Sequence, residues 1–137
     1  MSAPGFNGGD PSRAPRLAPA NRREAGWLNA RILDLLRRGA RTRRPPNLFA
    51  TLARHRRLFR GWLLFAGALM PRGVLPRSDT ELVILRVAHN SGCEYEWRHH
   101  ERLGRAAGLS AATIERVREG PDASGWGRRE QLLLRCA

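Results

Sequence analysis

The stretch from Asp79 to His100 reads DTELVILRVAHNSGCEYEWRHH and decides the fold. Its first half is apolar nearly all round, which is typical of a helix buried on every side. Ser91 and Gly92 interrupt this helix, and a second helix begins near Cys93 and continues to Gly108, a typical C-terminal stop. The stretch therefore predicts a core helix over about 79–90, capped by Ser78 or Asp79, and a second helix that follows it directly in the sequence.

Further helices are predicted on both sides of this stretch. Apolar residues three to four positions apart indicate a helix over about 22–38 and then a helix pair, or one bent helix, from a cap at Asn47 to Met70. Ser110 caps a short helix that ends at Gly120, and a last helix begins at Arg128. No segment requires a strand, so the predicted fold class is all-α, with three tryptophans expected in the core: Trp27, Trp62 and Trp97.

The 137 residues are enough for one domain with a single core. Residues 1–20 are rich in glycine and proline and predict a flexible arm, so we expect a single helical domain over 21–137. The helix from Arg128 is only about ten residues long at the chain end, and we expect it to be cut short. The longest apolar run is about half of what a membrane span needs, and the first residues lack the pattern of a secretory signal, so we expect no membrane partner and a cytoplasmic protein.

The net charge of +13 is concentrated in the first part of the chain. Residues 1–60 hold 14 arginines against three acidic residues, whereas residues 61–137 hold 11 against nine. Every basic residue of the two groups is arginine and none is lysine, a bias that a GC-rich genome produces without selection for phosphate contacts. We therefore favour a solvated basic face and do not expect a nucleic-acid partner.

The two cysteines, Cys93 and Cys136, lie far apart in the sequence and are expected to be free thiols. His99 and His100 are adjacent, and Cys93 precedes His100 by seven residues, which is not a zinc-ligand spacing. We expect no metal site and no cofactor. His55 and His89 are isolated, and we interpret both as structural.

The residues best placed for chemistry are Cys93, Glu96 and His100. A cysteine at a helix start lies near unpaired N–H groups that favour its thiolate, and the spacings of three and four residues put all three side chains on one helix face. The plain alternative stays open. Many cysteines between helices are inert small hydrophobes, and a glutamate four residues before a histidine is often a surface pair.

Five groups of residues form a pattern that extends from Asn47 to the chain end: Asn47–Phe49 with Leu52–His55, Leu75–Pro76 with Glu81–Arg86, Cys93–Trp97 with His100, Ala107–Ser110, and Glu119–Pro121. This pattern resembles the carboxymuconolactone decarboxylase family, which includes the alkylhydroperoxidase-D proteins. The resemblance implies a helical bundle of that type over about 47–137 and a homo-oligomer formed through helix packing.

The resemblance also implies a peroxidase-type site. In that branch a glutamate is followed twelve residues later by a Cys-x-x-Cys pair, and four residues after the pair by a histidine. Glu81, Cys93 and His100 match the first, second and last of these positions, while Glu96 replaces the second cysteine and Tyr95 the additional histidine. Cys93 is then the peroxide-reactive thiol, with Glu81 and His100 as a proton relay and an external thiol as the reductant.

Two other functions remain open beside a peroxidase. Glu81, Glu96 and His100 form a plausible proton-transfer set for a decarboxylase or lyase that acts on a small carboxylate or lactone. Arg86 is either a ligand for a substrate carboxylate or a buried partner of one of the two glutamates, and Tyr95 is a further candidate for substrate binding. The third alternative is a non-catalytic oligomeric scaffold.

Overall fold

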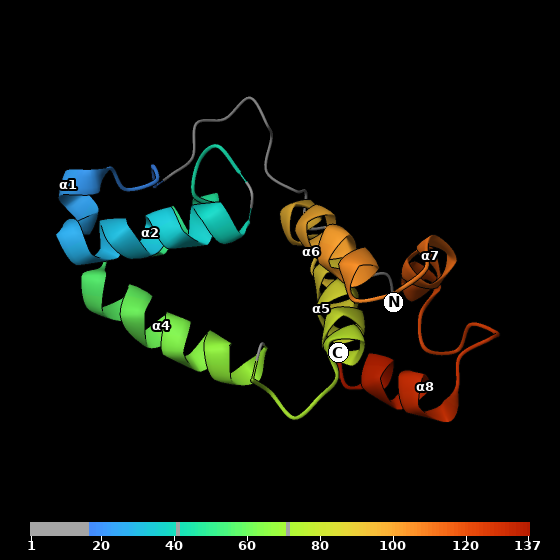
Figure 1. Ribbon diagram of the computed structural model, residues 1–137. Coiled ribbons are helices and arrows are strands. Elements are labelled where there is room, and N and C mark those ends of the chain that lie inside the picture. Colours follow the sequence, from blue (N-terminus) through green and yellow to red (C-terminus); the bar gives the residue numbers. More distant parts are fainter. Residues whose placement is uncertain (1–16, 41, 71) are drawn as a thin grey trace. The chain divides into compact units, whose positions relative to one another are not determined.

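The computed structural model describes residues 17–40, 42–70 and 72–137, which form eight α-helices and no strand (Figure 1). This confirms the all-α prediction. The described chain divides into two compact units, one ending at Leu69 and the other beginning at Met70. Most of the predicted arm lies outside the described residues, and the assignment of 21–137 to a single domain stays a prediction. No helix in the described ranges is both long and apolar enough to cross a membrane.

The first unit contains four helices: α1 (Arg22–Ala25), α2 (Trp27–Gly39), α3 (Asn47–Leu52) and α4 (Arg56–Leu69). Apolar residues from all four helices and their connections meet in one core, where Ala25, Leu33, Ala53 and Phe59 are buried. Phe49 packs edge-on against Trp62 with ring centroids 5.6 Å apart. The three-to-four-residue spacing seen in the sequence is therefore the spacing of this core.

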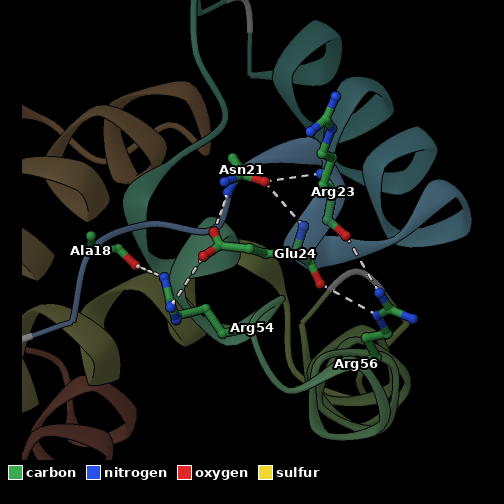
Figure 2. Close-up of polar contacts among 6 residues, drawn as sticks. All are labelled: Ala18, Asn21, Arg23, Glu24, Arg54 and Arg56. Atoms are coloured by element: carbon green, nitrogen blue, oxygen red, sulfur yellow. Dashed lines mark hydrogen bonds and ion pairs between the residues drawn. The ribbon is translucent and has the colours of Figure 1, made fainter.

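Polar contacts attach α1 to the start of α4, as Figure 2 shows. Asn21 and Glu24 form a reciprocal capping box at the start of α1. Arg54 donates to the carbonyl of Ala18 and forms an ion pair with Glu24, and Arg56 donates to the last carbonyls of α1. These contacts satisfy backbone groups that the short helix leaves unpaired.

The predicted helix over 22–38 is broken at Gly26, and the placement of Trp27 in the core was wrong. Gly26 has φ of +77° and ψ of 160°, a conformation that ends α1 and begins α2. Trp27 follows the break and is 80% exposed, whereas Trp97 is only 3% exposed as predicted, and Trp62 is half-buried. The periodicity of the apolar residues does not register such a break, because the residues on both sides still follow a helical spacing.

The second unit contains α5 (Arg77–Asn90), α6 (Glu94–Ala106), α7 (Ala111–Glu119) and α8 (Arg128–Arg135). The helix α5 packs against the other three, which confirms it as the core helix of this unit (Figure 1). Its burial is not complete, since Val87 is 47% exposed. The apolar core of the unit consists of Leu82, Leu85, Ala88, Trp97, Ile114, Val117, Trp126 and Leu134.

Two of the predicted caps were wrong and one is confirmed. Asn47 is the first residue of α3, and Ser78 and Asp79 both lie inside α5. Each of these helices begins directly after a proline, Pro46 or Pro76. The fixed φ of proline suits the residue that precedes a helix. Ser110 caps α7 as predicted, accepting a hydrogen bond of 3.0 Å from the Thr113 N–H.

We predict that Gly120→Ala lowers the free energy of unfolding by about 1–3 kcal/mol. Gly120 ends α7 with φ of +105° and ψ of −176°, a backbone region open almost only to glycine, and an added Cβ would lie 3.3 Å from Nη2 of Arg86. Urea denaturation measures the loss. Gly61→Ala is the control: this position lies inside α4 with nothing within 4 Å of an added Cβ, so alanine should stabilise by about 0.5–1 kcal/mol. Equal stabilities of Gly120→Ala and the wild type would contradict the prediction.

Candidate active site

The candidate site lies where α5 packs against α6. Glu81 is in the second turn of α5, and Glu96 and His100 lie one helical turn apart on α6. The turn between the helices depends on Gly92, which has φ of +62° and lets the chain reverse directly into α6. The reversal places a glutamate from α5 beside a histidine nineteen positions later in the chain.

Both nitrogens of the His100 imidazole contact a carboxylate. Nδ1 lies 2.8 Å from Oε2 of Glu81, and Nε2 lies 3.2 Å from Oε2 of Glu96. Only a protonated imidazole donates from both nitrogens at once, so this geometry suits the imidazolium. The three side chains form a continuous series in which a cation lies between two carboxylates.

The electrostatics agree with this geometry. Burial by itself lowers the pKa of His100, but the hydrogen bonds that it donates to the two glutamates and their negative charges outweigh burial and raise the pKa from 6.5 to about 9. The hydrogen bond from His100 likewise holds the pKa of Glu96 below its ordinary value. At neutral pH the site therefore contains a protonated His100 beside an ionised Glu96.

The exposure of the three side chains increases along the series. The Glu81 side chain is fully buried, the His100 side chain is 10% exposed and the Glu96 side chain is 33% exposed. Glu96 is thus the member that a solute in water can approach. A proton can pass from that end to the interior through a single imidazole.

Sequence reasoning missed Arg77, which forms an ion pair with Oε1 of Glu81. The contact is not aligned as a hydrogen bond, so Oε1 accepts none from the described residues, and the charge of Arg77 compensates this buried oxygen. Arg77 precedes Glu81 by four residues, the spacing at which opposite charges pair along a helix. This signal was present in the sequence, but the predicted helix began two residues too late to include it.

Cys93 is the residue immediately before α6, as predicted, and it is half-buried. Its backbone N–H donates to the carbonyl of Ala88, while its side chain makes no capping hydrogen bond to the first turn of α6. The hydrogen-bonded series thus consists of Glu81, His100 and Glu96. The Cys93 thiol lies at the start of α6, the helix that carries His100 and Glu96. Cys136 is exposed at the end of α8.

Among the described residues, the two predicted to bind substrate form no hydrogen bond or ion pair with this series. Arg86 donates to the carbonyls of Val117 and Arg118 at the end of α7, so it is the partner of neither Glu81 nor Glu96. Tyr95 is 47% exposed on α6. A role for either residue in binding a substrate stays a prediction.

The remaining histidines have local contacts. His55 accepts a hydrogen bond from the Leu58 N–H at the start of α4, and His89 packs edge-on against Trp97. His99 lies beside His100, where burial and the charge of His100 lower its pKa. Burial and the charges of two arginines also lower the pKa of His89. These contacts agree with the structural interpretation of His55 and His89.

Comparison with known proteins places the chain in a family. A model of the carboxymuconolactone decarboxylase family matches residues 56–137, from the start of α4 through α8. The match includes the whole hydrogen-bonded series and covers more than half of the chain. The residues from Asn47 to His55, which also resemble this family, precede the matched range. No curated protein and no solved structure matches the chain. The chain belongs to the carboxymuconolactone decarboxylase family.

Proposed function

We propose that this protein is an acid–base enzyme of its family that acts on a small carboxylate or lactone, with Glu81, His100 and Glu96 as the proton-transfer groups. The observation that supports it is the imidazole of His100, bonded to a buried carboxylate on one nitrogen and to a partly exposed carboxylate on the other. The family takes its name from a lactone decarboxylase, which is chemistry of this kind.

In this proposal the ionised Glu96 is the base that removes a proton from the substrate, because it is the most exposed member of the series. His100 is the acid that returns a proton to the carbanion or enolate left by loss of a proton or of carbon dioxide. Glu81 keeps the imidazole charged and oriented through its 2.8 Å contact with Nδ1. Arg77 is a positioning residue that holds the second oxygen of Glu81.

A peroxidase-type function that uses Cys93 is the second candidate. The half-buried position of this thiol directly before α6, three residues from Glu96, favours it. The Cys93 thiolate attacks one oxygen of a peroxide, the O–O bond breaks, and the products are a sulfenic acid and, after proton transfer, water or an alcohol. Because residue 96 is a glutamate, an external thiol has to reduce the sulfenic acid in two steps, releasing water and then a disulfide.

We predict that solvent exchange of an acidic C–H proton separates the two functions. Small lactone carboxylates incubated with the protein in D₂O should exchange that proton, as followed by ¹H NMR. His100→Gln and Glu96→Gln should lower the rate by about 10²–10⁴-fold, whereas Cys93→Ser should leave it unchanged. Glu94→Gln is the matched control, since Glu94 lies on the same helix and pairs with Arg98 on the surface.

The same variants test the peroxidase candidate with a peroxide and dithiothreitol. Peroxide consumption that is lost in Cys93→Ser, with sulfenic acid trapped at Cys93 in the wild type, would replace the acid–base proposal by the peroxidase. If the protein shows neither proton exchange nor peroxide consumption, both enzymatic functions are excluded, and the cluster has a structural role in an oligomeric scaffold.

A further inference from the structure

The outer face of α2 carries apolar and cationic side chains in alternation. Trp27, Arg31, Leu35 and Arg38 lie within about 100° of arc at the angular spacing of an α-helix. Trp27 is 80% exposed and Leu35 is 69% exposed, while Leu33 on the opposite face is buried in the core. The packing of the first unit does not account for the exposure of these apolar side chains.

Two open hollows lie along this face. One, of about 410 Å³, is lined by Trp27, Ala30 and Arg31 on α2 together with Gly26 and the two arginines of α1, Arg22 and Arg23. The other, of about 370 Å³, is lined by Arg22, Arg31, Asp34, Leu35 and Arg38. Arg22 and Arg31 belong to both, so the hollows adjoin each other and share their cationic border.

The positive charge of this face is not neutralised within its own unit. The only acidic residues between positions 17 and 69 are Glu24 and Asp34. Each already pairs with an arginine, Glu24 with Arg54 and Asp34 with Arg22. Arg31 and Arg38 form no ion pair with a described residue of this unit. The guanidinium of Arg23 points away from the polar network of α1 in Figure 2.

We infer that this face of α1 and α2 binds single-stranded nucleic acid, with a base stacked on Trp27 and neighbouring phosphates on Arg23, Arg31 and Arg38. An exposed aromatic ring among guanidinium groups is the arrangement that stacks bases and follows a phosphate backbone. The number of arginines in the sequence does not by itself indicate a nucleic-acid site. Their placement around an exposed tryptophan, along adjoining hollows, supports it.

The same face suits a membrane surface less well. A helix that lies in a bilayer interface separates a continuous apolar side from its basic side. On α2 the exposed apolar residues Trp27 and Leu35 alternate with arginines, and the continuous apolar side faces the protein core. Hollows with cationic borders also suit separate bases and phosphates better than a flat layer of lipid.

Fluorescence anisotropy of a labelled twelve-nucleotide oligothymidylate, titrated with the full chain, tests the inference. The logarithm of the binding constant should fall with the logarithm of salt concentration with a slope of about −2, for three contacted phosphates. Trp27→Ala should weaken binding about tenfold, and Trp27→Phe should restore most of the affinity. Arg31→Ala should weaken binding and reduce the salt slope by about 0.7.

The matched control is Arg128→Ala, which removes another exposed arginine, from α8 in the other unit. Equal losses from Arg31→Ala and Arg128→Ala, or unchanged binding by Trp27→Ala, would show attraction by net charge only and overturn the inference. The absence of binding at low salt would overturn it as well. So would Trp27-dependent sedimentation with phosphatidylserine vesicles without oligonucleotide binding. Because Trp27 is mostly exposed, its variants should keep the wild-type melting temperature. If Trp27→Ala lowers the melting temperature, Trp27→Phe provides a second test.

Discussion

Glu81→Gln should lower the free energy of unfolding by about 3–5 kcal/mol, the usual effect of breaking a buried ion pair from one side. Glutamine preserves the size of the side chain but removes a charge that compensates two cations. His100 would then keep only Glu96 as a partner, and Arg77 would lose its partner. The loss would appear in urea denaturation at neutral pH as a lower midpoint with an unchanged slope.

The control for this prediction is Glu94→Gln, which makes the same chemical change in an exposed pair. Glu94 and Arg98 form an ion pair of 2.9 Å on the surface of α6, with side chains 56% and 77% exposed. Such a pair contributes less than about 1 kcal/mol. If Glu81→Gln were as mild as Glu94→Gln, the buried series would not be a stabilising element.

The stability of the wild type should fall as the pH rises from about 6.5 to about 9. The folded protein holds the pKa of His100 at about 9, above the ordinary value of 6.5 that applies when the chain is unfolded. The stabilisation by the protonated imidazole is therefore complete below pH 6.5 and is lost as the pH rises through 9. The difference between the two pKa values corresponds to about 3 kcal/mol.

Urea denaturation at pH 6.5, 7.5 and 9 measures this dependence, with His100→Gln as the comparison. The variant should be less stable and should lose most of the slope between these pH values. A direct NMR titration of the His100 ring in the wild type tests the same claim without a variant. A midpoint near 6.5 in that titration would refute it.

The other shifted histidines act in a different pH range and with the opposite sign. The pKa values of His89 and His99 are lowered in the folded protein, so these residues bind more protons when the chain is unfolded. Their contribution makes stability rise with pH and ends near 6.5, the ordinary histidine value. The decline above that pH can therefore be assigned to His100.

The helices could be predicted from the sequence because the order of apolar residues is a local property. Spacings of three and four residues located all of the longer helices, and Ser110 was recognisable as a cap from its type and position. The conformation of Gly26 was not recognisable, since glycine occurs both inside helices and at their ends. Trp27 lies on α2 opposite the buried Leu33, and the apolar character of tryptophan did not show which face of the helix is buried, so its burial was predicted wrongly.

The candidate site was predictable to different degrees along its length. The pairing of Glu96 with His100 follows from a four-residue spacing within one helix. The contact of Glu81 with His100 depends on how α5 packs against α6, and only the resemblance to a family indicated it in advance. Arg86 was equally plausible as a partner by spacing, but the structure places its guanidinium at the end of α7.

The order of charges at the junction of α5 and α6 constrains how this sequence can change over evolutionary time. Arg77, Glu81, His100 and Glu96 alternate in sign, and together they carry no net charge around the buried Glu81. Losing one member leaves a monopole in a poorly polarisable medium, whereas losing two adjacent members of opposite sign restores neutrality. Descendants of this sequence should therefore retain the four residues as a set or replace them in neighbouring pairs.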